Sequence, residues 1–393
     1  MNLLSKNACY IYIVLWMMYY LQSILAISGV VAQTILFVLM VMSLYTFFKV
    51  NLNYRTGPYL KWLNVMLLIM TIYGVIPIIG GWTLIGEHPQ DSSVSYLYLQ
   101  RIYGSLLPIY VFYYFALTKR IPFSQLSYVY VAFVLYSILS YYQRYLYFTN
   151  KDWEVFTNNM GFLFIPLIPM LILLRVKDIW KYVFLVLIFV FIMMSVKRGA
   201  IIAGALLSVL FIVQNFQSAS RKKQAYLFCV SLIVVLIMSY VMVDLYANDE
   251  YFHRRVTATL AGDMSGREYL FSASFTHFFE KTTSLEFIIG NGANASFAMF
   301  GNLLHNDWLE FAISQGVLGV IMYIIYWIVF VWEWKNYSGT KECRFVLGSI
   351  IIAQFMQTFH SMSIDIMPTA TTLCIGYCLA ESIKGKTRGL IKT

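Results

Sequence analysis

Twelve apolar runs of about 17 to 25 residues recur along this sequence, and they limit what the chain can fold into. A run of that length spans roughly 30 Å of hydrocarbon as an α-helix. Only 12% of the 393 residues are charged, against about a quarter in soluble proteins. We therefore predict an all-α polytopic membrane protein in which residues 1–393 form a single transmembrane domain. The runs cover residues 9–27, 30–48, 60–80, 99–117, 125–143, 158–174, 180–196, 199–216, 225–246, 307–332, 345–362 and 366–383.

The basic residues orient these runs. No small-residue cleavage pattern follows the first run, which favours an uncleaved signal anchor. If the runs alternate from a cytoplasmic N-terminus, 19 of the 28 basic residues lie in the cytoplasm, as the positive-inside rule requires. Both termini are then cytoplasmic. This bias, together with attraction to anionic lipid, accounts for the net charge of +10, so we predict no nucleic-acid partner.

One connection is far longer than the others. Residues 247–306 separate the ninth and tenth runs, whereas ordinary connections are about 4 to 6 residues long. In this orientation the loop is extracytoplasmic, and it holds many of the polar residues of the chain. We therefore expect the functional site on this side of the membrane.

Two basic residues interrupt the apolar stretch 180–216. A single helix of that length would extend about 55 Å, so the chain must reverse at Lys197-Arg198-Gly199. One interpretation is that both cations extend to the outer headgroups. The other is that Arg198, at a helix N-terminus that is already partly positive, faces a bound anion.

A second arginine stands at a predicted helix start inside the loop. Ser265 and Glu268 have the spacing of a capping box, which puts Arg267 in the first turn. Arg267 alone is interpreted as a solvated surface residue. Together with Arg198 it favours a site for an anion, because guanidinium groups suit phosphate oxygens.

The tenth run opens with an unusual polar segment. Asn306 can cap the helix, and Asp307 and Glu310 then complement the dipole in its first turn. His305 has no such role, and a histidine near an anion site is a candidate general base. The cysteines and histidines lack metal-ligand spacing, so we predict no metal and no cofactor.

The order of these motifs resembles a known family. A basic turn (SVKRGA), a long loop with an arginine at a helix start (SGREYLF), a glycine-bearing stretch (IIGNGANASF) and HNDWLEFAISQGVLG follow one another. This order is similar to that of the bacterial O-antigen polymerase and O-antigen ligase superfamily (Wzy and WaaL type), whose late span begins with a histidine motif and continues to paired glycines, here Gly316 and Gly319. The family's basic turn more often reads Ser-Arg.

The resemblance implies a GT-C-like, metal-independent glycosyltransferase that uses undecaprenyl-diphosphate-linked sugars at the periplasmic face of the inner membrane. Carried onto this sequence, it implies that Arg198 and Arg267, with Lys197, bind the donor diphosphate and that His305 takes the acceptor proton. The implied partners are the lipid-linked oligosaccharide, membrane lipids, a chain-length regulator and a flippase.

Further polar residues lie on the eleventh run. Gln354, Gln357 and His360 recur every three positions near its outer half. With Asn306 they either line a substrate cleft or form hydrogen bonds between helices.

We favour a polymerase of O-antigen or a related surface polysaccharide, because polymerases are the more divergent group. A ligase that transfers glycan to lipid A core is the first alternative, and a flippase-type transporter is the second.

Overall fold

The computed structural model describes residues 7–80, 92–149, 158–261, 267–364 and 367–390, and every regular element within these ranges is helical. The longer helices are α1 (Ala8–Tyr20), α2 (Gly29–Asn53), α3 (Pro58–Gly80), α4 (Ser92–Leu117), α5 (Leu126–Thr149), α8 (Asp178–Met194), α9 (Arg198–Gln217), α10 (Arg221–Asn248), α15 (Asp307–Lys335), α16 (Lys341–His360) and α17 (Thr369–Leu390). The shorter ones are η1 (Phe123–Gln125), α6 (Gly161–Phe164), α7 (Leu167–Met170), η2 (Leu171–Leu173), α11 (Glu250–Leu260), α12 (Arg267–Thr276), the π-helical turn η3 (His277–Lys281), α13 (Ser284–Ile289) and α14 (Ala295–Phe300).

Six helical segments within the described residues are long and apolar enough to cross a membrane. They are Gly29–Asn53, Pro58–Ile76, Phe123–Tyr147, Arg198–Gln217, Arg221–Asn248 and Asp307–Lys335. The prediction of an all-helical chain of the membrane type is therefore confirmed. Twelve crossings and a GT-C-like arrangement stay predictions.

The sixth apolar run forms no continuous helix. Its residues are divided among α6, α7 and η2, and the breaks fall at Pro166 and near Pro169. Proline has no N–H to donate and its ring clashes with the carbonyl four residues before it, so the helix is interrupted at Pro166. Pro169 lies in the first turn of α7, where a missing N–H is tolerated. The predicted run is thus helical but interrupted.

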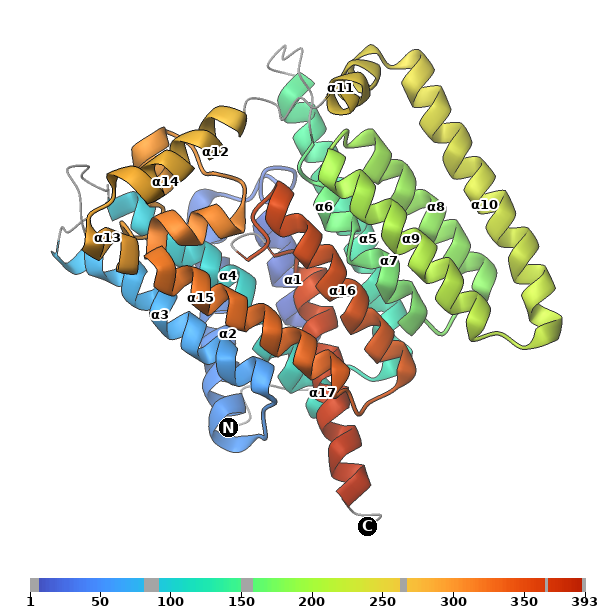
Figure 1. Cartoon of the computed structure of the whole chain (residues 1–393). Helices are drawn as coiled ribbons and strands as arrows, with labels where there is room; N and C mark the ends of the chain where they lie inside the picture. Colours follow the sequence, from blue (N-terminus) through green and yellow to red (C-terminus); the bar gives the residue numbers. More distant parts are fainter. Residues whose placement is uncertain (1–6, 81–91, 150–157, 262–266, 365–366, 391–393) are drawn as a thin grey trace.

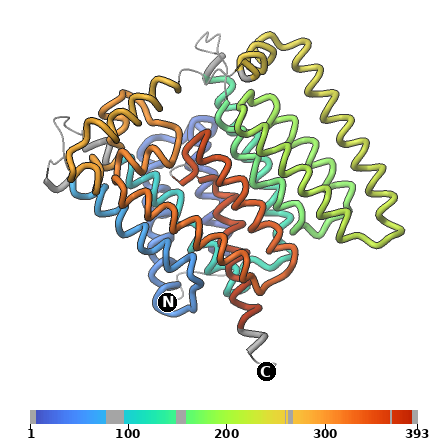
Figure 2. The backbone as a smooth tube through the Cα atoms, in the orientation of Figure 1, coloured from blue at the N-terminus to red at the C-terminus, as the bar shows by residue number. Residues whose placement is uncertain are grey.

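The bundle has two distinct ends (Figure 1). The short helices α12, α13 and α14 lie together at one end, here named the loop end, and α11 lies at the same end beside α10, while α1 begins and α17 ends at the other, here named the terminal end. The tube in Figure 2 shows α8, α9 and α10 side by side along one edge, with α10 outermost. The described parts of the segment 247–306, predicted to be a long loop, therefore lie at one end of the bundle.

The centre of the bundle is the pair α4 and α17. Residues from Ile109 to Ala116 on α4 are all buried. On α17, a Cβ built on Gly376 would lie 2.5 Å from Ile109 O and 2.8 Å from Tyr113 N. The absence of a side chain at Gly376 therefore lets the two helix backbones touch, as small residues do between membrane helices.

Helix α15 is broken near its first third. Gly316 has φ 65° and ψ −159°, which is not helical. The break frees two carbonyls of the preceding turn, and the glycine-rich loop supplies their partners: Asn291 N donates to Ile313 O over 3.0 Å and Gly292 N donates to Ser314 O over 2.9 Å. The loop thus inserts into the kink of α15 and fixes its outer third.

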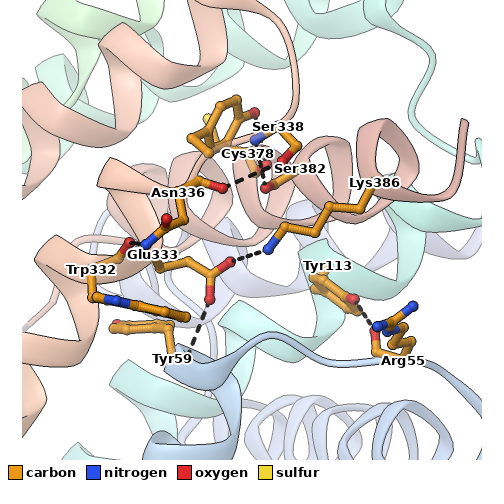
Figure 3. A network of polar contacts seen from close by, with 11 residues as sticks. Arg55, Tyr59, Tyr113, Trp332, Glu333, Asn336, Ser338, Cys378, Ser382 and Lys386 are labelled. Atoms are coloured by element: carbon orange, nitrogen blue, oxygen red, sulfur yellow. Dashed lines mark hydrogen bonds and ion pairs between the residues drawn. The ribbon is translucent and has the colours of Figure 1, made fainter. Parts of the chain in front are cut away.

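A polar network holds the terminal end of α15 (Figure 3). Glu333 is 1% exposed. Its Oε1 lies 3.5 Å from Lys386 Nζ on α17, and its Oε2 accepts from Tyr59 N at the start of α3 over 3.5 Å. A Cβ on Gly57 would lie 2.5 Å from Glu333 Oε2. One buried carboxylate therefore links three helices, and glycine makes room for it.

We expect Glu333→Ala to destabilise the protein by about 2 kcal/mol, because it removes the hydrogen-bond acceptor of Tyr59 N and leaves Lys386 without its ion pair. Glu333→Gln keeps an acceptor and should lose less. Thermal unfolding in detergent measures both, with the exposed Glu342→Ala as the control. Equal melting temperatures for Glu333→Ala and Glu342→Ala would show that the network is dispensable.

Candidate functional site

The turn before α9 places two cations at the loop end. α9 begins at Arg198 with Lys197 as its N-cap, so the chain reverses where the sequence predicts. Val196 in this turn has φ 50°, a strained conformation for a β-branched residue. Asn158 N donates to Ser195 O over 2.9 Å and holds the turn.

Three elements that are distant in sequence meet beside this turn. Arg267 Nη1, at the start of α12, donates to His360 O at the end of α16 over 2.9 Å. A Cβ built on Gly199 would lie 2.9 Å from His360 Cβ, which is closer than carbon atoms normally approach. The lack of a side chain at Gly199 therefore allows the start of α9 to meet the end of α16, and Arg267 joins them.

His305 lies in a constrained loop before α15. Its φ is 52°, in the left-handed region that non-glycine residues seldom adopt. On one side Leu304 N donates to Glu310 Oε2 over 3.2 Å. On the other, Leu309 N donates to Asn306 Oδ1 over 3.1 Å, which confirms Asn306 as the helix cap. The backbone on both sides of His305 is therefore held in place.

The first turn of α15 is a buried attachment point. Sequence reasoning gives Asp307 and Glu310 only a helix-start role, but they are 2% and 8% exposed. Asp307 accepts from Ser363 N over 3.0 Å and from Tyr323 OH over 2.8 Å. Glu310 also accepts from Ser296 Oγ over 2.5 Å. These carboxylates therefore fasten the segments next to His305 and His360, and we assign them as positioning residues.

The charges at this site act on one another. The pKa of Lys197 is lowered to about 8, by burial first and then by the charges of Arg267 and Arg255. The pKa of Arg267 is lowered by burial and by the charges of Arg255 and Arg198. Burial, Arg267 and Lys197 lower the pKa of His305 to about 4. Lys197, Arg198, Arg255 and Arg267, here named the cation cluster, thus lie in electrostatic range of one another, beside an imidazole that is neutral at pH 7.

Arg255 is the member that sequence reasoning left unassigned. Phe252 of α11 is 1% exposed and packs with Val196 below it. Arg255 follows Phe252 by three residues, which puts both on the inward side of α11. Arg254 instead lies over the Tyr251 ring, 5.8 Å from its centroid, and is exposed. The i, i+3 spacing of Phe252 and Arg255 is the feature of the sequence that could have indicated that Arg255 faces inward.

The predicted cleft residues on α16 have separate surroundings. Gln357 Nε2 donates to Met362 O over 3.1 Å and so closes the turn after α16. Gln354 is buried, and its Oε1 has no hydrogen-bond partner among the described residues. His360 lies at the cation cluster through its backbone contact with Arg267. A cleft formed by Gln354, Gln357 and Asn306 stays a prediction.

We expect Gly199→Ala to lower the melting temperature, because the new Cβ would lie 2.9 Å from His360 Cβ and 3.4 Å from Phe162 Cζ. Overpacking of this kind costs roughly 1 to 3 kcal/mol. Gly29→Ala is the matched control, since nothing lies within 4 Å of a Cβ there. If the two variants unfold at the same temperature, the close approach of α9 and α16 is not required for stability.

The site combines two chemical capacities. Guanidinium groups offer forked donors that match phosphate oxygens. An anion between them would offset the mutual repulsion that, after burial, lowers the pKa values of Lys197 and Arg267. A neutral imidazole can accept a proton. The geometry is thus suited to binding a phosphate-type anion beside a proton acceptor.

Comparison of this sequence with protein-family models gives no match, and comparison with curated proteins gives none either.

Proposed function

We propose that this protein is a polymerase of O-antigen or a related surface polysaccharide. It transfers a growing glycan from undecaprenyl diphosphate to the next lipid-linked repeat unit. The observation that supports this most is the convergence of Arg198, Arg267 and Lys197 with His305 at one end of a membrane-type helical bundle. These are the residues for which the family resemblance implies diphosphate binding and proton transfer.

In the proposed reaction the acceptor hydroxyl oxygen attacks C1 of the donor sugar. The bond between C1 and the phosphate oxygen breaks, and its electron pair leaves with the undecaprenyl diphosphate. Arg198, Arg267 and Lys197 stabilise the negative charge that develops on this leaving group. The hydroxyl proton goes to the imidazole of His305.

Substrate binding also strengthens the base. His305 has a pKa of about 4 because it is buried and lies near Arg267 and Lys197. A diphosphate bound among these cations offsets their charge, and its own charge favours the protonated imidazole. The pKa of His305 therefore rises when the donor is bound, and the imidazole becomes a better proton acceptor at that moment.

The proposal includes an orientation. Twelve crossings in a GT-C-like arrangement put both termini in the cytoplasm and the cation cluster on the periplasmic face of the bacterial inner membrane. The distribution of the 28 basic residues supports this orientation. The polyprenyl tail then lies among the helices while the diphosphate and sugars reach the loop end.

Reconstitution tests the proposal directly. The purified protein in liposomes, supplied with an undecaprenyl-diphosphate-linked repeat unit, is expected to produce a ladder of longer glycans, with and without a metal chelator. Products that form only when lipid A core is added would instead support the ligase. Movement of the lipid-linked unit across the bilayer without a new glycosidic bond would support the flippase and contradict a transferase.

A further inference from the structure

A basic pocket lies at the terminal end of the bundle, away from the cation cluster. It has a volume of about 570 Å³. Its walls come from the turn between α4 and α5, the end of η2, the start of α16 and one face of α17. The residues that line it are Lys119, Ile121, Pro122, Phe123, Ile172, Leu174, Arg175, Thr340, Glu342, Tyr377, Glu381 and Lys384.

Lys119 occupies a position at which glycine would be the less strained residue. Arg120 N donates to Phe115 O over 2.8 Å and Lys119 N donates to Ala116 O over 3.1 Å, the bonding pattern that closes a helix C-terminus. Lys119 has φ 56°, in the left-handed region that glycine adopts without strain. The chain therefore presents an exposed ammonium group at the pocket from a strained backbone position.

The second cation of the rim is Arg175. Its guanidinium carbon lies 4.8 Å from the centroid of the Phe123 ring, a cation–π arrangement. The Phe123 ring in turn lies 6.4 Å from that of Tyr377. Arg175 is exposed, so its charge stands at the mouth of the pocket above an aromatic and aliphatic floor.

Two of the remaining charged groups of the pocket are paired with each other. Lys384 Nζ lies 2.6 Å from Glu381 Oε1 and donates to Ala116 O over 2.7 Å. Glu342 also lines the pocket, so its three cations and two carboxylates give the lining a net charge of +1. The exposed cations of the rim are Lys119 and Arg175.

We propose that this pocket binds the phosphodiester headgroup of an anionic membrane phospholipid. The phosphate lies between Lys119 and Arg175, and the glycerol and first acyl carbons pack on Phe123, Tyr377 and Leu174. Basic pockets between membrane helices bind such headgroups. A free phosphate is also an anion but would leave the apolar floor unused, which is why we commit to the lipid.

Native mass spectrometry of the full-length protein in detergent tests this site. Phosphatidylglycerol is added in one arm, phosphatidylethanolamine in a second, and inorganic phosphate together with phosphatidylglycerol in a third. We expect selective retention of phosphatidylglycerol. Since one basic residue near a membrane surface contributes a factor of about five in affinity, loss of both rim cations should weaken retention about 25-fold.

The variants are chosen so that misfolding does not imitate the result. Lys119→Gly removes the charge and relieves the left-handed backbone, so it is expected to fold at least as well as the parent. It is combined with Arg175→Ala. Lys177→Ala is the matched control, because it removes an exposed charge two residues from Arg175 outside the pocket. Retention by the double variant equal to that of Lys177→Ala would overturn the proposal, as would displacement of the lipid by millimolar phosphate.

Discussion

Glycan transfer is expected to fall by about 10² to 10³-fold when either Arg198 or Arg267 is replaced by alanine, since in the proposed reaction each variant lacks a preorganised donor to the leaving diphosphate. Arg267→Ala also removes the hydrogen bond from Nη1 to His360 O. It should therefore show a rise in KM together with the fall in kcat. Transfer in the reconstituted liposomes, measured over a range of donor concentrations, separates the two effects.

Two further variants control this result. Arg198→Lys keeps the charge but not the forked donors, so only partial activity is expected. Arg254→Ala removes an exposed arginine that lies over Tyr251 on the far side of α11. It is expected to retain activity within about twofold, as exposed residues usually do. Comparable losses in Arg254→Ala and Arg267→Ala would mean that general surface charge, and no specific site, drives the reaction.

His305→Ala should lower kcat by about 10² to 10⁴-fold, because the variant lacks the group that takes the acceptor proton in the proposed reaction. The pH dependence distinguishes this role from a structural one. The free protein has a His305 pKa of about 4, so kcat/KM should fall only as the pH drops towards 4. In the proposed reaction bound diphosphate raises that pKa, so the acid limb of kcat should lie at a higher pH than the acid limb of kcat/KM.

The matched control is His253→Ala, which changes an exposed histidine of α11. Its profile should coincide with that of the parent protein. His305→Gln keeps a polar side chain of similar length but cannot accept the proton, and its residual activity should lose the acid limb. An unchanged acid limb in His305→Gln would exclude His305 as the base while leaving the role of the arginines open.

Much of the fold follows from hydropathy because the length of an apolar run and the bilayer thickness are physically linked. The predicted runs 30–48, 199–216 and 307–332 fall within α2, α9 and α15, respectively. Asn306 was recognisable as a cap because its side chain serves a local donor, Leu309 N. Features of this kind depend on neighbours within one turn of chain.

Contacts between residues that are distant in the sequence could not be predicted from it. Nothing local places Arg267 against His360, which is 93 positions away. The left-handed backbone of Val196 and His305 was equally hidden, because a single sequence shows residue types and not φ angles. Asp307 and Glu310 had an adequate local explanation, which concealed their long-range partners Ser363 and Ser296.

The burial of Lys197, together with the like charges of Arg267 and Arg255, also weakens the folded state. The pKa of Lys197 is about 8 in the folded protein, below the ordinary lysine value of 10.5, so the protonated form is disfavoured by folding. This destabilisation is present in full below pH 8 and disappears as the pH rises towards 10.5. Lys197→Gln should therefore melt at a higher temperature than the parent at pH 7 and lose that advantage near pH 10. The buried charge of Lys197 therefore lowers the thermal stability of the protein at neutral pH, a cost that is acceptable if the proposed anion site requires this cation.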